Sequence, residues 1–181
     1  MYEDGPRPPP AALAFAERVR RIVGTATALH ARGEGTPTPI RCTRRPKRKR
    51  CDGRLEVQLI DIPRDVVRWR CPRCGDAGEV YGWRGESWDL DEIELGAGPV
   101  VQLELAEAEH EALFNMFEAE PVADAVVCGA VLVKPGIVRL RAPEEAMIAL
   151  AEAAAAEYTF TDSPTRRRRL GRVCDLLDEL V

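Results

Sequence analysis

The stretch that decides the fold begins with RCTRRPKRKRCDG at residues 41–53 and ends with WRCPRCGD at residues 69–76. It holds four of the six cysteines of the chain: Cys42, Cys51, Cys71 and Cys74. Two residues separate Cys71 from Cys74, and the glycine after them can adopt a positive φ that turns backbone N–H groups toward the sulfurs. Nineteen residues separate Cys51 from Cys71, which is typical of two zinc-binding pairs. The spacing therefore predicts one zinc ion held by four thiolates.

Cys42 is the least regular member of this set. Eight residues lie between it and Cys51, where about two to four are usual. Four other side chains could take its place: His30, His110, Cys128 and Cys174. Ordinary buried thiols and a redox pair are competing interpretations, although no thioredoxin-like strand and helix surround the CxxC. A four-thiolate site leaves no open position and the chain has no His-x-Glu, so we expect a structural zinc rather than a catalytic one.

The segment between Cys42 and Cys51 is strongly basic. Residues 41–54 hold eight positive side chains against Asp52 alone. Six of them lie between the two cysteines: Arg44, Arg45, Lys47, Arg48, Lys49 and Arg50. A zinc ion that holds both ends keeps these charges concentrated, which suits the phosphates of RNA or DNA. The alternatives are docking on an acidic protein partner, self-association, or a solvated surface with no special role.

Charge is also divided unevenly along the chain, whose net charge is -4. Residues 1–90 hold 18 basic and 12 acidic side chains, whereas residues 91–181 hold 8 basic and 18 acidic ones. This division indicates either a basic face for a polyanion or two halves that attract each other. A second basic cluster, Arg166–Arg169, stands at the start of the last predicted helix, where it opposes the helix dipole.

Around the cysteines the hydrophobic pattern predicts a small antiparallel zinc ribbon. Its strands are expected at residues 55–60, 66–69 and 80–83. So short a unit rarely folds on apolar burial alone, and we expect a metal ion bound by the cysteines to stabilise it. Trp69, Trp83 and Trp88 flank it, and we expect them to cover its core rather than to stack on bases, with Trp88 as the exception.

The regions on either side have their own patterns. A Pro-rich arm over residues 1–10 precedes an amphipathic helix over 11–31, whose apolar face includes Phe15, Ile22 and Val23. Glycines and prolines in residues 33–39 predict a linker. Residues 96–181 predict strand, helix, helix, strand, helix and helix. Within them residues 122–133 suit a buried helix or a strand, and we favour a helix over 122–130.

The fold class is therefore α+β. The predicted domains are the arm and helix at 1–39, the zinc ribbon at 40–95 and an α/β part at 96–181. Signatures of catalysis are missing from the sequence, since it has no HExxH, phosphate loop, GxSxG or glycine-rich dinucleotide turn. We expect a protein that is not an enzyme. With no apolar run long enough to span a membrane and no export signal, we expect a cytoplasmic location. The arginine- and alanine-rich, lysine-poor composition is typical of a GC-rich bacterial genome.

The ribbon region also resembles a group of uncharacterised bacterial zinc-ribbon proteins. The matching motifs are Ile40-Arg41-Cys42, Cys51-Asp52-Gly53, Trp69-Arg70-Cys71-Pro72-x-Cys74-Gly75-Asp76, and Gly82-Trp83 ahead of Trp88-Asp89-Leu90. The Ala- and Glu-rich helix followed by Arg166–Leu170 is similar as well. The resemblance implies a zinc ribbon joined to a helical α+β part, and it implies no catalytic residues.

Overall fold

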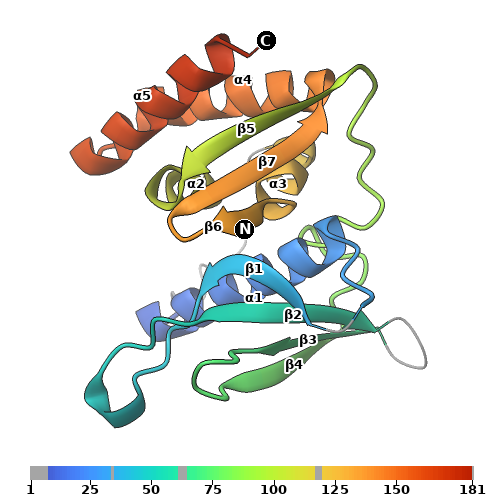
Figure 1. The fold of residues 1–181 in the computed structure, drawn as a ribbon, viewed down its shortest axis with the longest axis vertical. Helices are drawn as coiled ribbons and strands as arrows, with labels where there is room; N and C mark the ends of the chain where they lie inside the picture. The colour runs from blue at the N-terminus through green and yellow to red at the C-terminus, as the bar shows by residue number, and fades with distance from the viewer. Residues whose placement is uncertain (1–7, 34, 61–64, 117–119, 181) are drawn as a thin grey trace, which may run out of the picture.

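The computed structural model describes residues 8–33, 35–60, 65–116 and 120–180, so that most of the predicted arm, residues 1–7, lies outside it. The chain forms an α+β fold with an N-terminal helix, a four-stranded antiparallel sheet, and then further helices around a second, three-stranded sheet (Figure 1). The two sheets lie in separate layers, with α1 between them in the view of Figure 1. The α+β class that the sequence predicts is confirmed.

The first sheet has the order β1-β2-β3-β4. Its strands are β1 (Thr36–Arg41), β2 (Arg54–Ile60), β3 (Val66–Arg70) and β4 (Ala77–Tyr81). Alternation in β2 places Leu55, Val57 and Leu59 on the buried face, as the period-two pattern predicts. Trp83 is fully buried in the same core, while Trp69 and Trp88 are each half-buried.

Helix α1 (Pro10–Ala28) covers this buried face with the second half of its length. Ile22, Val23 and Ala26 pack against the inward residues of the sheet. Phe15, predicted to lie on the buried face, is instead 69% exposed. The periodicity assigns Phe15 to the correct face of an amphipathic helix, but it cannot show that the first turns of α1 lie outside the packed interface.

The segment predicted to be a linker over residues 33–39 is largely a strand. β1 pairs antiparallel with β2 along the edge of the sheet, and it runs across the predicted boundary between residues 39 and 40. Prolines 37 and 39 are compatible with this position because an edge strand does not need every N–H for pairing. Thr38 between them is buried, and its hydroxyl donates to the carbonyl oxygen of Leu55 at 2.8 Å.

The second sheet has the order β5-β7-β6 and is antiparallel. The elements of this part follow in chain order: β5 (Val100–Ala106), α2 (Glu107–Phe114), α3 (Pro121–Cys128), β6 (Val131–Lys134), β7 (Ile137–Pro143), α4 (Glu144–Phe160) and α5 (Pro164–Asp178). The favoured helix over 122–130 is confirmed as α3, but β6 is a strand missing from the predicted order. The helix ends at Cys128, and the residues after it form β6. A turn at Gly136, with φ of +86°, reverses the chain so that β6 pairs with β7.

Ion pairs join the basic first half of the chain to the acidic second half. Arg21 of α1 contacts Glu111 at 2.8 Å. Arg41 and Arg54, at the ends of β1 and β2, both bind the carboxylate of Glu107. The uneven charge distribution therefore serves, in part, to hold the two halves together.

Candidate metal centre

Four cysteine side chains converge at one end of the first sheet. The Sγ atoms of Cys42, Cys51, Cys71 and Cys74 all lie within 4.8 Å of one another. Cys42 follows β1 and Cys51 precedes β2, while Cys71 follows β3 and Cys74 precedes β4. Because neighbouring strands run antiparallel, both connections emerge at the same end of the sheet. The clustering predicted from the spacing is confirmed, and the cluster can hold a metal ion.

Cys42 belongs to this cluster despite its long spacing from Cys51. It is fully buried, and its Sγ lies 3.6 Å from that of Cys74. The alternative ligands lie elsewhere. His30 contacts Asp91 at 2.8 Å, and His110 contacts the carbonyl oxygen of Val127 at 3.0 Å. Cys128 is next to Gly24 of α1, and Cys174 packs against the core of the second sheet.

Backbone N–H groups lie close to two of the sulfurs, and a glycine turn follows Cys74. The amide of Arg44 donates to the Sγ of Cys42 at 3.5 Å, and the amide of Gly53 donates to that of Cys51 at 3.3 Å. Gly75 has the expected positive φ, +73°, and its amide donates to the carbonyl oxygen of Cys71 at 2.9 Å. N–H groups near the sulfurs stabilise thiolates, which are the form that binds metals.

Two of the sulfur–sulfur distances match those expected around a tetrahedral metal ion such as zinc. Zinc–thiolate bonds of about 2.3 Å at tetrahedral angles put neighbouring sulfurs about 3.8 Å apart. The pair Cys42–Cys74 is separated by 3.6 Å and the pair Cys51–Cys71 by 3.8 Å. Burial raises the pKa of the Cys42 thiol to about 12. A metal that binds here must therefore displace protons, and its affinity falls as the pH falls.

Asp76 ties the cysteine cluster to its surroundings. Its side chain is only 8% exposed, and it accepts from Arg44 at 2.6 Å and from Arg18 of α1 at 3.1 Å. Arg18 also stacks on the ring of Trp69, with its guanidinium carbon 4.5 Å from the ring centroid. Sequence reasoning missed this role, because the only signal is an acidic residue after the CPxCG motif.

The basic loop between Cys42 and Cys51 carries a short 3₁₀ turn, Pro46–Arg48. All six predicted cations on it are exposed. Arg44 forms its ion pair with Asp76, whereas five form none with any described residue: Arg45, Lys47, Arg48, Lys49 and Arg50. The loop therefore presents uncompensated charge, whereas the flanking Arg41 and Arg54 are both engaged by Glu107.

The second basic cluster is partly structural. Arg166 forms an ion pair with Glu157 at 2.8 Å, and Arg167 donates to the carbonyl oxygen of Thr161 at 2.6 Å. Ser163 caps the helix, since its Oγ accepts from the amide of Arg166 at 3.4 Å. Half of this cluster thus fixes the connection between α4 and α5.

Comparisons with protein-family models, with curated proteins and with solved structures give no match. The resemblance to bacterial zinc-ribbon proteins therefore stays a prediction. Among the described residues, no helix is both long and apolar enough to cross a membrane.

Proposed function

We propose that this chain is a non-catalytic zinc-ribbon protein, in which one structural zinc ion holds a basic loop in place for contact with RNA or DNA. The zinc part rests on four clustered thiols with tetrahedral spacing. Four protein ligands leave no position for a substrate, so the ion contributes to folding and not to a reaction.

The zinc assignment is tested by metal content and competition. We expect about one zinc ion per chain, bound through thiolates. Cys42→Ser removes one sulfur and should lower the affinity for zinc by more than tenfold. Cys174→Ser is the matched control, because it also removes one thiol but lies in the other core. Equal zinc content and affinity in the two variants would exclude Cys42 as a ligand.

The nucleic-acid part rests on one observation, the five adjacent cations that lack an anionic partner among the described residues. Cations nearby on β1, β2 and α1 do have such partners, which makes the loop the exception. The loop projects from the end of the first sheet that points away from the second sheet (Figure 1). Both ends of the loop carry a cysteine of the cluster, so a bound metal limits the entropy lost when the loop contacts phosphates.

Binding of a labelled RNA or DNA oligonucleotide across a salt series tests this role. The logarithm of affinity should fall linearly with the logarithm of salt concentration, by about 0.7 to 0.9 for each phosphate contacted. Arg48→Gln with Lys49→Gln should reduce this slope by about 1 to 2. Lys134→Gln with Arg141→Gln is the control, because both side chains are exposed and form no ion pair with a described residue.

Removing the zinc with a chelator should weaken binding as well, because the loop loses its anchored ends. Affinity that is independent of salt, or that survives the loop substitutions, would rule out this function. If the same loop instead captures an acidic protein, the loop substitutions abolish that capture while oligonucleotides remain unbound.

A further inference from the structure

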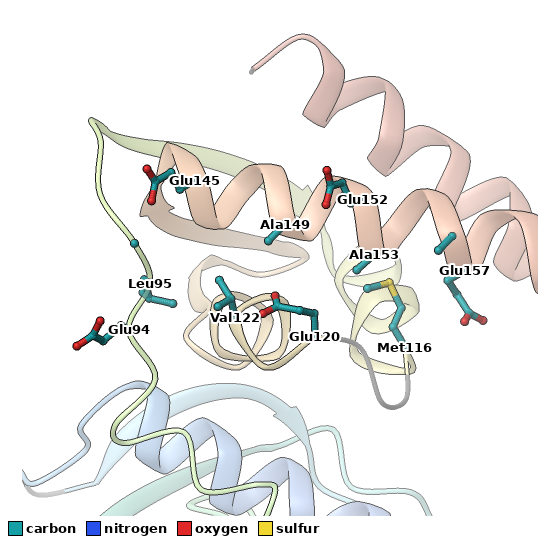
Figure 2. Close-up of a pocket in the computed structure, with 12 residues that line it drawn as sticks. Glu94, Leu95, Met116, Glu120, Val122, Glu145, Ala149, Glu152, Ala153 and Glu157 are labelled. Atoms are coloured by element: carbon teal, nitrogen blue, oxygen red, sulfur yellow. The ribbon is translucent and has the colours of Figure 1, made fainter.

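The C-terminal part has a groove with an apolar floor and an acidic rim (Figure 2). Its cavity has a volume of about 510 Å³. Its apolar floor and inner walls are formed by Leu95, Met116 and Val122, and by the small side chains of Ala149 and Ala153 on α4. In Figure 2, Val122 at the start of α3 faces the alanines of α4 across the groove.

Glutamates surround this floor: Glu94, Glu120, Glu145, Glu152 and Glu157. Two of them are engaged, since Glu145 accepts from the amide of Ala97 at 2.8 Å and Glu157 binds Arg166 at 2.8 Å. The remaining three, Glu94, Glu120 and Glu152, form no ion pair with any residue that the structure describes. The groove therefore combines negative charge that no described residue compensates with an apolar lining that no described residue fills.

Long cationic side chains fit both properties of the groove. The methylene stems of lysine and arginine cover apolar surface while their charged heads reach polar groups at its edge. Carboxylates form charge-assisted hydrogen bonds with those heads. A purely apolar partner would leave the glutamates desolvated without a counter-charge, which is unfavourable.

The chain itself carries a segment with this chemistry, the basic loop. Its five cations without an anionic partner match the unpaired glutamates of the groove. The loop lies at the outer end of the first sheet, while α4 lies on the far side of the second sheet (Figure 1). The loop and α4 therefore lie at opposite ends of the molecule in Figure 1, and the loop is far from the groove of its own chain.

We propose that the basic loop of one copy docks in the acidic groove of a second copy. The two surfaces are different, so the contact is heterologous, and a pair of copies keeps one free loop on one copy and one free groove on the other. Copies therefore associate head to tail, and the association weakens as salt screens the charges. The proposal does not rest on nucleic-acid binding, although RNA or DNA on the loop would compete with the groove.

Sedimentation velocity of the zinc-loaded, nucleic-acid-free protein tests the contact. The wild type should show mass-dependent association that reverses with added salt. Glu120→Lys with Glu152→Lys should raise the apparent dissociation constant by about tenfold or more, because like charges then face each other. Lys47→Glu with Arg48→Glu on the loop should do the same.

Mixing the two variants gives the decisive result. The groove variant keeps a wild-type loop and the loop variant keeps a wild-type groove, so an equimolar mixture should restore a complex that neither forms alone. Glu86→Lys with Glu179→Lys is the control, because both glutamates are exposed and away from the groove, and association should persist. A wild type that stays monomeric at low salt overturns the proposal, and so does a mixture that stays monomeric. Loss of nucleic-acid binding alone leaves it standing.

Discussion

Gly53 and Gly75 lie beside the cysteine cluster and are required for different reasons. Gly75 has a φ of +73°, and a Cβ built on it would meet nothing within 4 Å. Gly53 lacks a positive φ, but a Cβ on it would lie 2.6 Å from both the Sγ of Cys71 and the Cβ of Arg73. One position needs the freedom of glycine and the other needs its missing side chain.

Alanine substitutions should separate these two requirements. Gly75→Ala should lower the free energy of unfolding by about 1 to 2 kcal/mol, through backbone strain, with zinc affinity nearly unchanged. Gly53→Ala should displace the sulfurs and lower zinc affinity markedly. Competition with a coloured chelator measures the affinity, and thermal unfolding measures the stability. Equal zinc affinities in the two variants would contradict this division of roles.

His110 is a buried titratable group in the second core. Its side chain is 3% exposed, and Nε2 lies 3.0 Å from the carbonyl oxygen of Val127. Burial lowers the pKa of His110 from 6.5, because the charged ring loses its hydration. The unfolded chain therefore takes up a proton more readily than the folded one, and stability is lost as the pH falls below 6.5.

This dependence predicts a difference between the wild type and His110→Gln. The free energy of unfolding of the wild type should fall by up to about 1.4 kcal/mol for each pH unit below the unfolded pKa of His110, and the variant should lack this component. Urea unfolding at neutral pH and at about pH 5.5 measures it. Burial also raises the pKa of Asp124 to about 6. The folded chain therefore takes up that proton more readily than the unfolded one, so this group raises the stability as the pH falls. Both proteins carry Asp124, so the difference between them isolates His110; parallel pH curves would contradict the assignment.

At the scale of elements, α1 connects the two parts of the molecule. One face packs in the core of the first sheet, while Arg21 binds Glu111 of α2 and Arg20 lies 3.7 Å from Asp124 of α3. Arg18 reaches Asp76 beside the cysteines. A single helix therefore contacts both the surroundings of the cysteine cluster and the C-terminal part.

Two alanine substitutions on α1 test where its packing lies. Ile22 is 1% exposed, so Ile22→Ala should lower the free energy of unfolding by about 2 to 5 kcal/mol. Phe15 is 69% exposed, so Phe15→Ala should change stability by no more than about 0.5 kcal/mol. Chemical denaturation of both variants measures the contrast. A large loss from Phe15→Ala would show that the first turns of α1 are packed after all.

At the scale of the molecule, the described residues form two separate hydrophobic cores. One lies between α1 and the first sheet and includes three of the four clustered cysteines. The other lies between the second sheet and the C-terminal helices, and it includes none of the four clustered cysteines. Because the first core is the smaller one, a metal ion bound by its cysteines should contribute more to its stability than to that of the larger core.

Zinc removal should therefore loosen one part before the other. With a chelator at neutral pH, amides of β1 to β4 should lose protection from hydrogen exchange, while those of β5, β7 and α4 should keep it. Lowering the pH should favour release, because protons compete for the thiolates. Returning zinc should restore protection. A uniform loss of protection across both sheets would show that the two cores unfold as one unit.

Local sequence signals determined the α+β class, the cysteine cluster, the basic loop and the alternation of β2. They did so because cysteine spacing, charge runs and a period-two pattern are properties of short stretches. The glycines and prolines of residues 33–39 predict a linker because they mark turns locally, and only pairing with β2 along the sheet edge makes residues 36–41 a strand. Likewise, residues 131–134 form the strand β6 because they pair with β7, and their own sequence does not predict that pairing.

Tertiary structure alone decided which cysteines cluster and which charged side chains form ion pairs. The sequence favoured Cys42 as the fourth ligand but left Cys128, Cys174 and two histidines as possible substitutes, and strand pairing brought Cys42, and none of those four, to the other three sulfurs. It placed eight cations in residues 41–54 without distinguishing them, and the fold paired Arg41 and Arg54 with a distant Glu107 while leaving most of the loop uncompensated. Contacts between residues far apart in the chain depend on how the two sheets stack, and no local pattern encodes that arrangement.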